Sequence, residues 1–165
     1  MIARPADFRG LLEALDLGGV EFIVIGGVAA ALHGSARATL DLDVVYRRSG
    51  DNIARLVTAL APLTPYLRGA PPGLPFTFDV ATVMRGLNFT LDTSRGSLDL
   101  LGEVTGGGSF DDLLPFTITV DLFGHACHCV TLAKLIALKR AVGRPKDNEV
   151  IAELEALRER GSEPQ

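Results

Sequence analysis

Two aspartates separated by one residue are the best candidates for chemistry in this chain. Asp41 and Asp43 lie in the run 39–46 (TLDLDVVY), which is otherwise mostly apolar and predicts a strand. Alternate residues of a strand share a face, so both carboxylates should point one way, with Leu40, Leu42 and Val44 turned into the core. Paired carboxylates repel one another and are costly to bury. Mg²⁺ (or Mn²⁺) would remove this cost, because it binds carboxylate and phosphate oxygens. The alternative is a hydrated edge strand.

Two glycines precede this strand and suggest how a phosphate would be held. Gly26 and Gly27 stand between a predicted buried strand at 20–25 and a predicted short helix at 28–32. Glycine lets a phosphate approach the backbone closely, and a helix N-terminus offers unpaired N–H groups. Such a turn is common by itself. The prediction of a phosphate site depends on the order of elements: strand, two glycines, helix, and then the strand with the two aspartates.

Residues 22–46 (FIVIGGVAAALHGSARATLDLDVVY) resemble the signature of the DNA polymerase β-like nucleotidyltransferase superfamily. In that signature a GG or GS turn is followed by a helix and by a strand with DxD or DxE. The form R-x-T-x-D-x-D, here residues 37–43, is similar to the AbiE-type toxin branch. The resemblance implies a nucleotidyltransferase fold, a nucleoside triphosphate (NTP) as substrate and a bound divalent metal.

The same resemblance asks for a third carboxylate from a later strand, and we assign it to Asp99. This residue lies between leucines in the run SLDLL, and it would serve as a metal ligand or as the general base for the acceptor hydroxyl. Four other acids compete for the role, of which Asp121 is the strongest rival. The other three are Asp79, Asp92 and Glu103.

Arg37 and Thr39 are predicted to bind the nucleotide. The Arg37 guanidinium could hold phosphate through two hydrogen bonds, or could instead pair with Asp41 to hold the loop. Thr39 fits the start of a strand as well as it fits a ligand. His33 is expected to end the short helix without a catalytic role.

The C-terminal region adds Lys139 and Asp147. They resemble the AbiE-type pattern of a helix lysine followed by an R…(K/R)D element, although the spacing here is short. The resemblance implies that Lys139 neutralises phosphate charge and that Asp147 orients it or the acceptor, while Asp147 also suits the N-cap of the last helix. The cations at 139, 140, 144 and 146 form a candidate nucleic-acid patch or a solvated helix end.

The fold class predicted from these elements is α/β (α+β), a mixed sheet with helices packed on one side and a helical C-terminal tail. Residues 1–165 are expected to form one domain, with a catalytic core over about 1–130 and C-terminal helices over 131–160. Asp51 is expected to cap the helix at 53–60. The proline-rich stretch 62–75 is expected to be a loop, for which a lid and a substrate-facing segment are two open interpretations. The remaining predicted helices are 8–15, 132–141 and 149–159, and the remaining strands are 87–91, 97–104, 116–122 and 126–130.

Composition narrows the class of protein. Of the 165 residues 47% are hydrophobic and 22% charged, which is typical of a globular chain, and no apolar run is long enough to span a membrane. The net charge of −4 gives no overall basic field for nucleic acid. The N-terminus does not resemble a secretory signal, and with two cysteines we expect a cytoplasmic location. His125, Cys127 and Cys129 alternate as zinc ligands might on a strand, but no fourth ligand follows, so buried cysteines are expected.

These observations predict a metal-dependent enzyme that moves a nucleoside monophosphate from an NTP to an acceptor. The resemblance implies RNA (a tRNA end) or a protein as acceptor, and a toxin–antitoxin setting with an antitoxin protein as partner. A small-molecule acceptor, such as an antibiotic, and a catalytically inactive binding module are the alternatives. The sequence names neither the base nor the acceptor.

Overall fold

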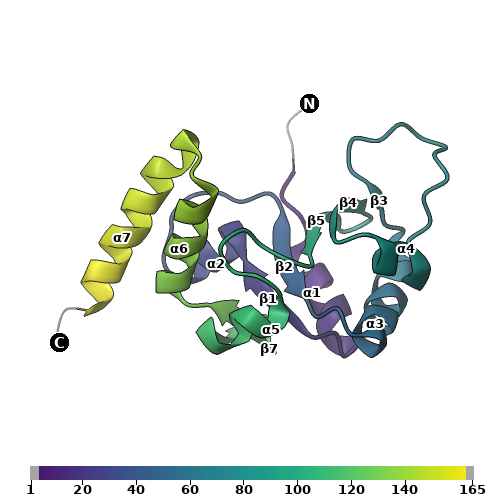
Figure 1. The fold of residues 1–165 in the computed structure, drawn as a ribbon, viewed down its shortest axis with the longest axis horizontal. Coiled ribbons are helices and arrows are strands. Elements are labelled where there is room, and N and C mark those ends of the chain that lie inside the picture. The colour runs from purple at the N-terminus through teal and green to yellow at the C-terminus, as the bar shows by residue number, and fades with distance from the viewer. Residues whose placement is uncertain (1–3, 163–165) are drawn as a thin grey trace.

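A seven-stranded mixed sheet forms the centre of the molecule (Figure 1), which the computed structural model describes over residues 4–162. The order across the sheet is β3-β4-β5-β2-β1-β7-β6. The pairings β2–β5 and β1–β7 are parallel and the others are antiparallel. The strands are β1 (Phe22–Ile25), β2 (Leu42–Tyr46), β3 (Tyr66–Leu67), β4 (Asn88–Thr93), β5 (Gly96–Leu101), β6 (Thr117–Leu122) and β7 (His125–Val130).

The helices form where apolar residues recur at helical spacing. Figure 1 shows α6 and α7 together at one end of the molecule, and α3 and α4 near the other end, beside β3 and β4. The α-helices are α1 (Phe8–Leu17), α2 (Gly26–Leu32), α3 (Gly50–Leu60), α4 (Val80–Arg85), α5 (Phe110–Leu113), α6 (Leu132–Val142) and α7 (Asn148–Ser162). Short 3-10 helices span Ala61–Leu63, Leu114–Phe116 and Pro145–Asp147. The mixed α/β fold predicted from the sequence is confirmed.

The three central strands position the acidic residues. All four residues of β1 are buried, and so are Leu42, Val44 and Val45 of β2, because both faces of these strands are covered. The register of β2 sets Asp43 opposite Ile25 on one side and opposite Asp99 on the other. Because β2 and β5 run parallel, residues at matching positions point to the same face.

Several predicted boundaries were wrong. The strand predicted over 39–46 begins at Leu42, and Leu40 is 40% exposed instead of lying in the core. The reason is that the Leu40 carbonyl oxygen accepts a hydrogen bond from the N-terminal segment, at Ala6 N, instead of extending the sheet. The strand predicted to run to 104 ends at Leu101, and Val104 forms an isolated bridge to Gly108 around a tight turn.

The cap of α3 was also predicted wrongly. Ser49, and not Asp51, is the N-cap residue, and its hydroxyl oxygen accepts from Asn52 N. Asp51 instead lies in the first turn, where its negative charge interacts favourably with the positive end of the helix dipole.

The proline-rich stretch 62–75 is not loop throughout. Tyr66 and Leu67 form β3, which pairs with Asp92 and Leu91 of β4 and ends the sheet on that side. This strand is too short to leave a periodic pattern in the sequence, which explains why the prediction missed it.

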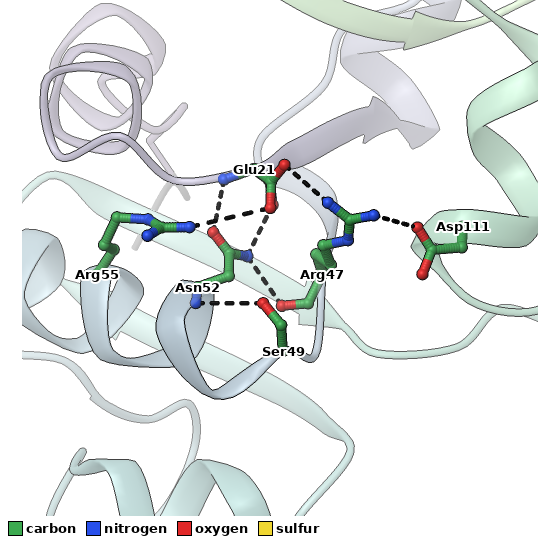
Figure 2. A network of polar contacts seen from close by, with 6 residues as sticks. All are labelled: Glu21, Arg47, Ser49, Asn52, Arg55 and Asp111. Carbon is green, nitrogen blue, oxygen red and sulfur yellow. Dashed lines mark hydrogen bonds and ion pairs between the residues drawn. The ribbon is translucent and has the colours of Figure 1, made fainter.

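A buried polar network fastens α3 to the strand ends (Figure 2). Asn52 is fully buried; its side chain accepts from Glu21 N at 2.7 Å and donates to the carbonyl oxygens of Glu21 and Arg47 at 3.0 and 2.8 Å. Arg47 also bridges the carboxylates of Glu21 and Asp111. The Glu21 N–H and the Arg47 carbonyl oxygen, which lie beyond the last residue pair of β1 and β2, are thereby satisfied, and the Glu21 carbonyl oxygen also accepts from Arg47 N at 3.2 Å.

No helix within residues 4–162 combines the length and the apolar character needed to cross a membrane.

Replacing Asn52 with alanine should lower the free energy of unfolding by about 2–4 kcal/mol, because the Glu21 N–H and the Arg47 carbonyl oxygen lose their partner. Urea denaturation measures this change. Asp51→Ala, in the same helical turn but exposed, is the control and should cost less than about 1 kcal/mol. Equal losses in the two variants would contradict the role assigned to the network.

Candidate active site

Three carboxylates predicted from the sequence converge on one face of the sheet. Asp43 of β2 and Asp99 of β5 occupy paired positions of parallel strands, and Asp41 lies directly before β2. The Asp99 side chain is 24% exposed and that of Asp41 is 40% exposed, so the cluster is partly open to solvent. Asp41 precedes β2, so alternation along the strand does not place it as predicted, but its charge still acts on Asp43 and it lies 3.6 Å from Arg68.

Burial and like charge act together on Asp43. Burial, more than any other cause, raises the pKa of Asp43 to about 7, and a hydrogen bond to Asp99 and the charges of Asp99 and Asp41 act in the same direction. Lys139 opposes the shift. In the absence of a further cation, a pKa of about 7 leaves Asp43 partly protonated at neutral pH.

Arg68, which the sequence analysis did not single out, reaches into this cluster from the end of β3. Its Nη2 atom donates to an Asp99 oxygen at 2.8 Å, its Nε atom donates to Asp92 at 3.2 Å, and its Nη1 atom lies 3.6 Å from an Asp41 oxygen. The sequence gives one weak indication of a role for Arg68: it is the single charged residue in the proline-rich stretch 62–75.

Gly26 packs directly against Asp43. A Cβ atom at Gly26 would lie 2.0 Å from an Asp43 carboxylate oxygen, and the backbone there has φ +66, a conformation that disfavours other residues. A Cβ at Gly27 would meet the hydroxyl of Thr39 at 2.4 Å. Both predicted glycines are therefore required for close packing around the cluster, and they form the first turn of α2 instead of a separate turn before it.

Lys139 of α6 lies between two cavities. The larger, of about 280 Å³, has an apolar wall and a polar rim that includes Glu103, Lys139 and Asp147, and it reaches Gly26. The smaller, of about 150 Å³, is lined by Gly27, Ser35, Arg37, Thr39 and Lys139, among others. A cation at this junction can act on anionic groups in either cavity.

Arg37 lines the smaller cavity, but its ion pairs turn it toward α7. Its guanidinium lies 3.7 Å from Glu149 and 3.6 Å from Glu153, and the Ser35 hydroxyl donates to Glu153 at 2.6 Å. The Arg37–Asp41 pair considered from the sequence is not among its contacts. Instead, α7 anchors the loop that carries Thr39, whose hydroxyl donates to the Asp41 carbonyl oxygen at 3.2 Å.

Asp147 is buried beside the larger cavity. A hydrogen bond from Arg144, 2.8 Å from Nε to a carboxylate oxygen, is the main cause that lowers the pKa of Asp147, and the positive charge of Lys139 acts the same way. Arg140 forms an ion pair with Glu155 of α7. Two of the four cations in the predicted nucleic-acid patch are therefore paired with acids.

The rival acids lie outside the cluster or at its edge. Asp79 caps α4, and Asp121 on the edge strand β6 accepts a hydrogen bond from Gly124 N. Asp92 touches the cluster only through Arg68. His125 contacts Asp16 at 2.7 Å, while Cys127 and Cys129 are buried.

The carboxylates present fit a magnesium ion of the kind that binds with a substrate. Mg²⁺ is commonly held by one or two carboxylates and completed by phosphates and water. Asp43 and Asp99 supply such a pair, and their mutual repulsion favours a cation. Among residues 4–162 no group of three or more His, Cys, Asp or Glu side chains lies in positions that could by themselves hold a metal ion. Phosphate oxygens of a substrate and water would complete the shell of an ion held by two carboxylates.

Two solved structures share this architecture. The lincosamide antibiotic adenylyltransferase LnuA, solved with lincomycin bound, superposes with a TM-score of 0.60 at 13% identity, over 92% of this chain and 96% of that one. The Thermotoga maritima protein TM1012, assigned as a nucleotidyltransferase, superposes with a TM-score of 0.57 at 13% identity, over 90% of each chain. The chain has the nucleotidyltransferase fold. No protein-family model and no curated sequence matches it.

Replacing Asp43 with asparagine should change how stability depends on pH. The folded-state pKa of Asp43, about 7, lies above its ordinary value of 3.8, so ionisation between these values costs the folded state stability as pH rises. Without metal, Asp43→Asn should gain stability relative to wild type from pH 4 to pH 8, reaching about 1–3 kcal/mol. Thermal unfolding in chelator across this range measures the difference; a difference that does not vary with pH would contradict it.

Replacing Gly26 with alanine should destabilise the protein by about 1–3 kcal/mol, because the new methyl group meets Asp43 and the backbone is left-handed. Gly50→Ala provides a matched control at the first residue of a helix, where a Cβ would meet nothing within 4 Å. That variant should change stability by less than about 1 kcal/mol. Urea denaturation measures the free energy of unfolding of both variants. Equal losses would contradict the role assigned to close packing at Gly26.

Proposed function

We propose that this protein transfers a nucleoside monophosphate from an NTP to an acceptor hydroxyl and releases pyrophosphate. The observation that carries the proposal is the pairing of Asp43 with Asp99 on parallel strands, with Gly26 packed against Asp43, in a chain that has the nucleotidyltransferase fold. Partly buried like charges at paired positions destabilise a fold, so their presence favours a functional role.

The reaction is an in-line displacement at the α-phosphorus. The acceptor oxygen forms a bond to phosphorus, the bond from phosphorus to the oxygen bridging to the β-phosphate breaks, and the bonding electrons leave with pyrophosphate. Asp99 takes the proton of the acceptor hydroxyl. Lys139 offsets negative charge on the phosphates. A divalent cation held by Asp41, Asp43 and Asp99 would supply charge neutralisation at the phosphate oxygens.

The two cavities around Lys139 suit two parts of a nucleotide. Gly27, Arg37, Thr39 and Lys139 give the smaller cavity the polar lining that a triphosphate needs. The larger cavity has the size and the apolar wall suited to a nucleoside, with Asp147 on its rim to orient it. Asp99 and Arg68 lie on the other side of Asp43, toward β4, which leaves that side for the acceptor.

Two classes of acceptor are proposed, a macromolecule (RNA or protein) and a small molecule. The resemblance of residues 22–46 to AbiE-type toxins favours RNA, as a tRNA end, or a protein, with an antitoxin as partner. A small-molecule acceptor is favoured by the likeness to LnuA over nearly the whole length of both chains. The pairing of Arg140 and Arg144 with acids also favours it, because it reduces the charge available to an RNA backbone.

The test is incorporation of label from each α-³²P-labelled NTP in Mg²⁺ or Mn²⁺, with tRNA, protein extract, a lincosamide or an aminoglycoside as acceptor. Label in one acceptor class, abolished by chelator, is the expected result. Asp43→Ala, Asp99→Ala and Lys139→Ala should each reduce the rate by at least about a hundredfold. Asp121→Asn is the matched control, since it changes a strand aspartate far along the sheet and should leave the rate unchanged.

Two results would count against the proposal. Equal incorporation by wild type and Asp43→Ala would remove these residues from the reaction. Nucleotide binding by a folded wild-type protein, without incorporation into any acceptor class, would favour the binding-module alternative.

A further inference from the structure

The acidic cluster already contains a cation of its own, and it comes from outside the sequence motifs. Arg68 contacts three aspartates through three different nitrogen atoms: Nη2 to Asp99, Nε to Asp92 and Nη1 to Asp41. Its side chain is 26% exposed, so solvent screens these charges only in part. Two of the three aspartates are the ones proposed above to hold a divalent metal.

A metal ion and the Arg68 guanidinium would compete for the negative charge of the same two carboxylates, Asp99 and Asp41. The Asp99 oxygen that accepts from Arg68 at 2.8 Å already has a strong charge-assisted partner. A metal ligand must direct a lone pair at the ion, and a second full positive charge beside a guanidinium is repelled. Simultaneous occupation in the present geometry is therefore unfavourable.

The surroundings of Arg68 allow its side chain to withdraw without unfolding β3. Its backbone N donates to Thr90 O at 3.0 Å, and its Nη2 also donates to the Leu91 carbonyl oxygen at 2.8 Å. The Asp92 carboxylate, at the outer edge of the cluster, is 55% exposed. Arg68 can thus keep its backbone bond to Thr90 and its Nε contact with Asp92 while the end of the guanidinium, including Nη2, turns away from Asp99 and Asp41.

We propose that Arg68 is a displaceable counter-ion: it occupies Asp99 and Asp41 in the metal-free protein and withdraws toward Asp92 when a metal and its nucleotide bind. The proposal rests on the proposed function, because it takes these carboxylates as the metal ligands. It adds that the affinity for metal is set by exchange with an internal arginine. Premature binding of metal without nucleotide is thereby suppressed, since the phosphates must help to offset the lost ion pairs.

Isothermal titration calorimetry with Mn²⁺ on chelator-treated, nucleotide-free protein tests this exchange. Arg68→Gln should bind Mn²⁺ at least about tenfold more tightly than wild type, because the competing cation is gone. Arg68→Lys, which keeps the charge but loses the planar fork, should lie between the two. Arg95→Gln is the matched control: it removes one positive charge from an arginine that pairs with Asp7 outside the cluster, and its Mn²⁺ affinity should equal that of wild type.

Thermal unfolding of the same proteins gives a second measurement. Without metal, Arg68→Gln should melt below wild type, because three aspartates lose a neutralising partner, and Mn²⁺ should raise its melting temperature more than it raises that of wild type. If Arg68→Gln does not fold without metal, Arg68→Lys still provides the comparison with wild type.

Each outcome decides the matter. Equal or weaker Mn²⁺ binding by folded Arg68→Gln or Arg68→Lys would overturn the counter-ion role while leaving the proposed nucleotidyl transfer in place. Absence of Mn²⁺ binding by every variant, with and without a non-hydrolysable NTP analogue, would overturn the proposed metal site and this inference together.

Discussion

Repulsion between Asp43 and Asp99 is the constraint around which the site is built. The parallel pairing of β2 with β5 fixes these two carboxylates at matching positions on the same face, and neither can turn away without leaving the strand register. Partial burial limits how far water screens these charges, and burial is the main cause of the raised pKa of Asp43. Two cations reduce this repulsion. Lys139 of α6 acts on Asp43, and Arg68, at the end of β3, pairs with Asp99.

Packing and hydrogen bonds elsewhere in the fold fix the positions of the strands that carry Asp43 and Asp99. The hydrophobic residues of β1 and β2 bury the centre of the sheet, and the Asn52 network satisfies the backbone where β1 and β2 meet α3. The likeness to LnuA and TM1012 at 13% identity shows that the same architecture forms from largely different side chains. Such tolerance is expected when burial pattern and strand order, more than individual contacts, determine a fold.

The parts of the site predicted from the sequence are those governed by short-range periodicity. Alternation along single strands located Asp43 and Asp99, and adjacency to a buried strand located Gly26, because these relations involve only a few neighbouring residues. Arg68 was missed because β3 has two residues and depends on pairing with β4, which lies more than twenty residues later. The partners of Arg37 were missed for the same reason, since Glu149 and Glu153 belong to a helix near the other end of the chain. Nothing local to either arginine specifies a partner so distant in sequence.

The attachment of α7 to the loop that carries Thr39 has a consequence for how the protein is made. Ser35 and Arg37 are synthesised long before Glu153, which lies in the first half of α7 and contacts both. The sheet also lacks β7, the parallel neighbour of β1, until residue 130 has been added. A nascent chain can therefore carry all three aspartates while the loop beside them is still unanchored. Assembly of the phosphate-facing wall therefore cannot be completed before Glu153 has been synthesised, 118 residues after Ser35.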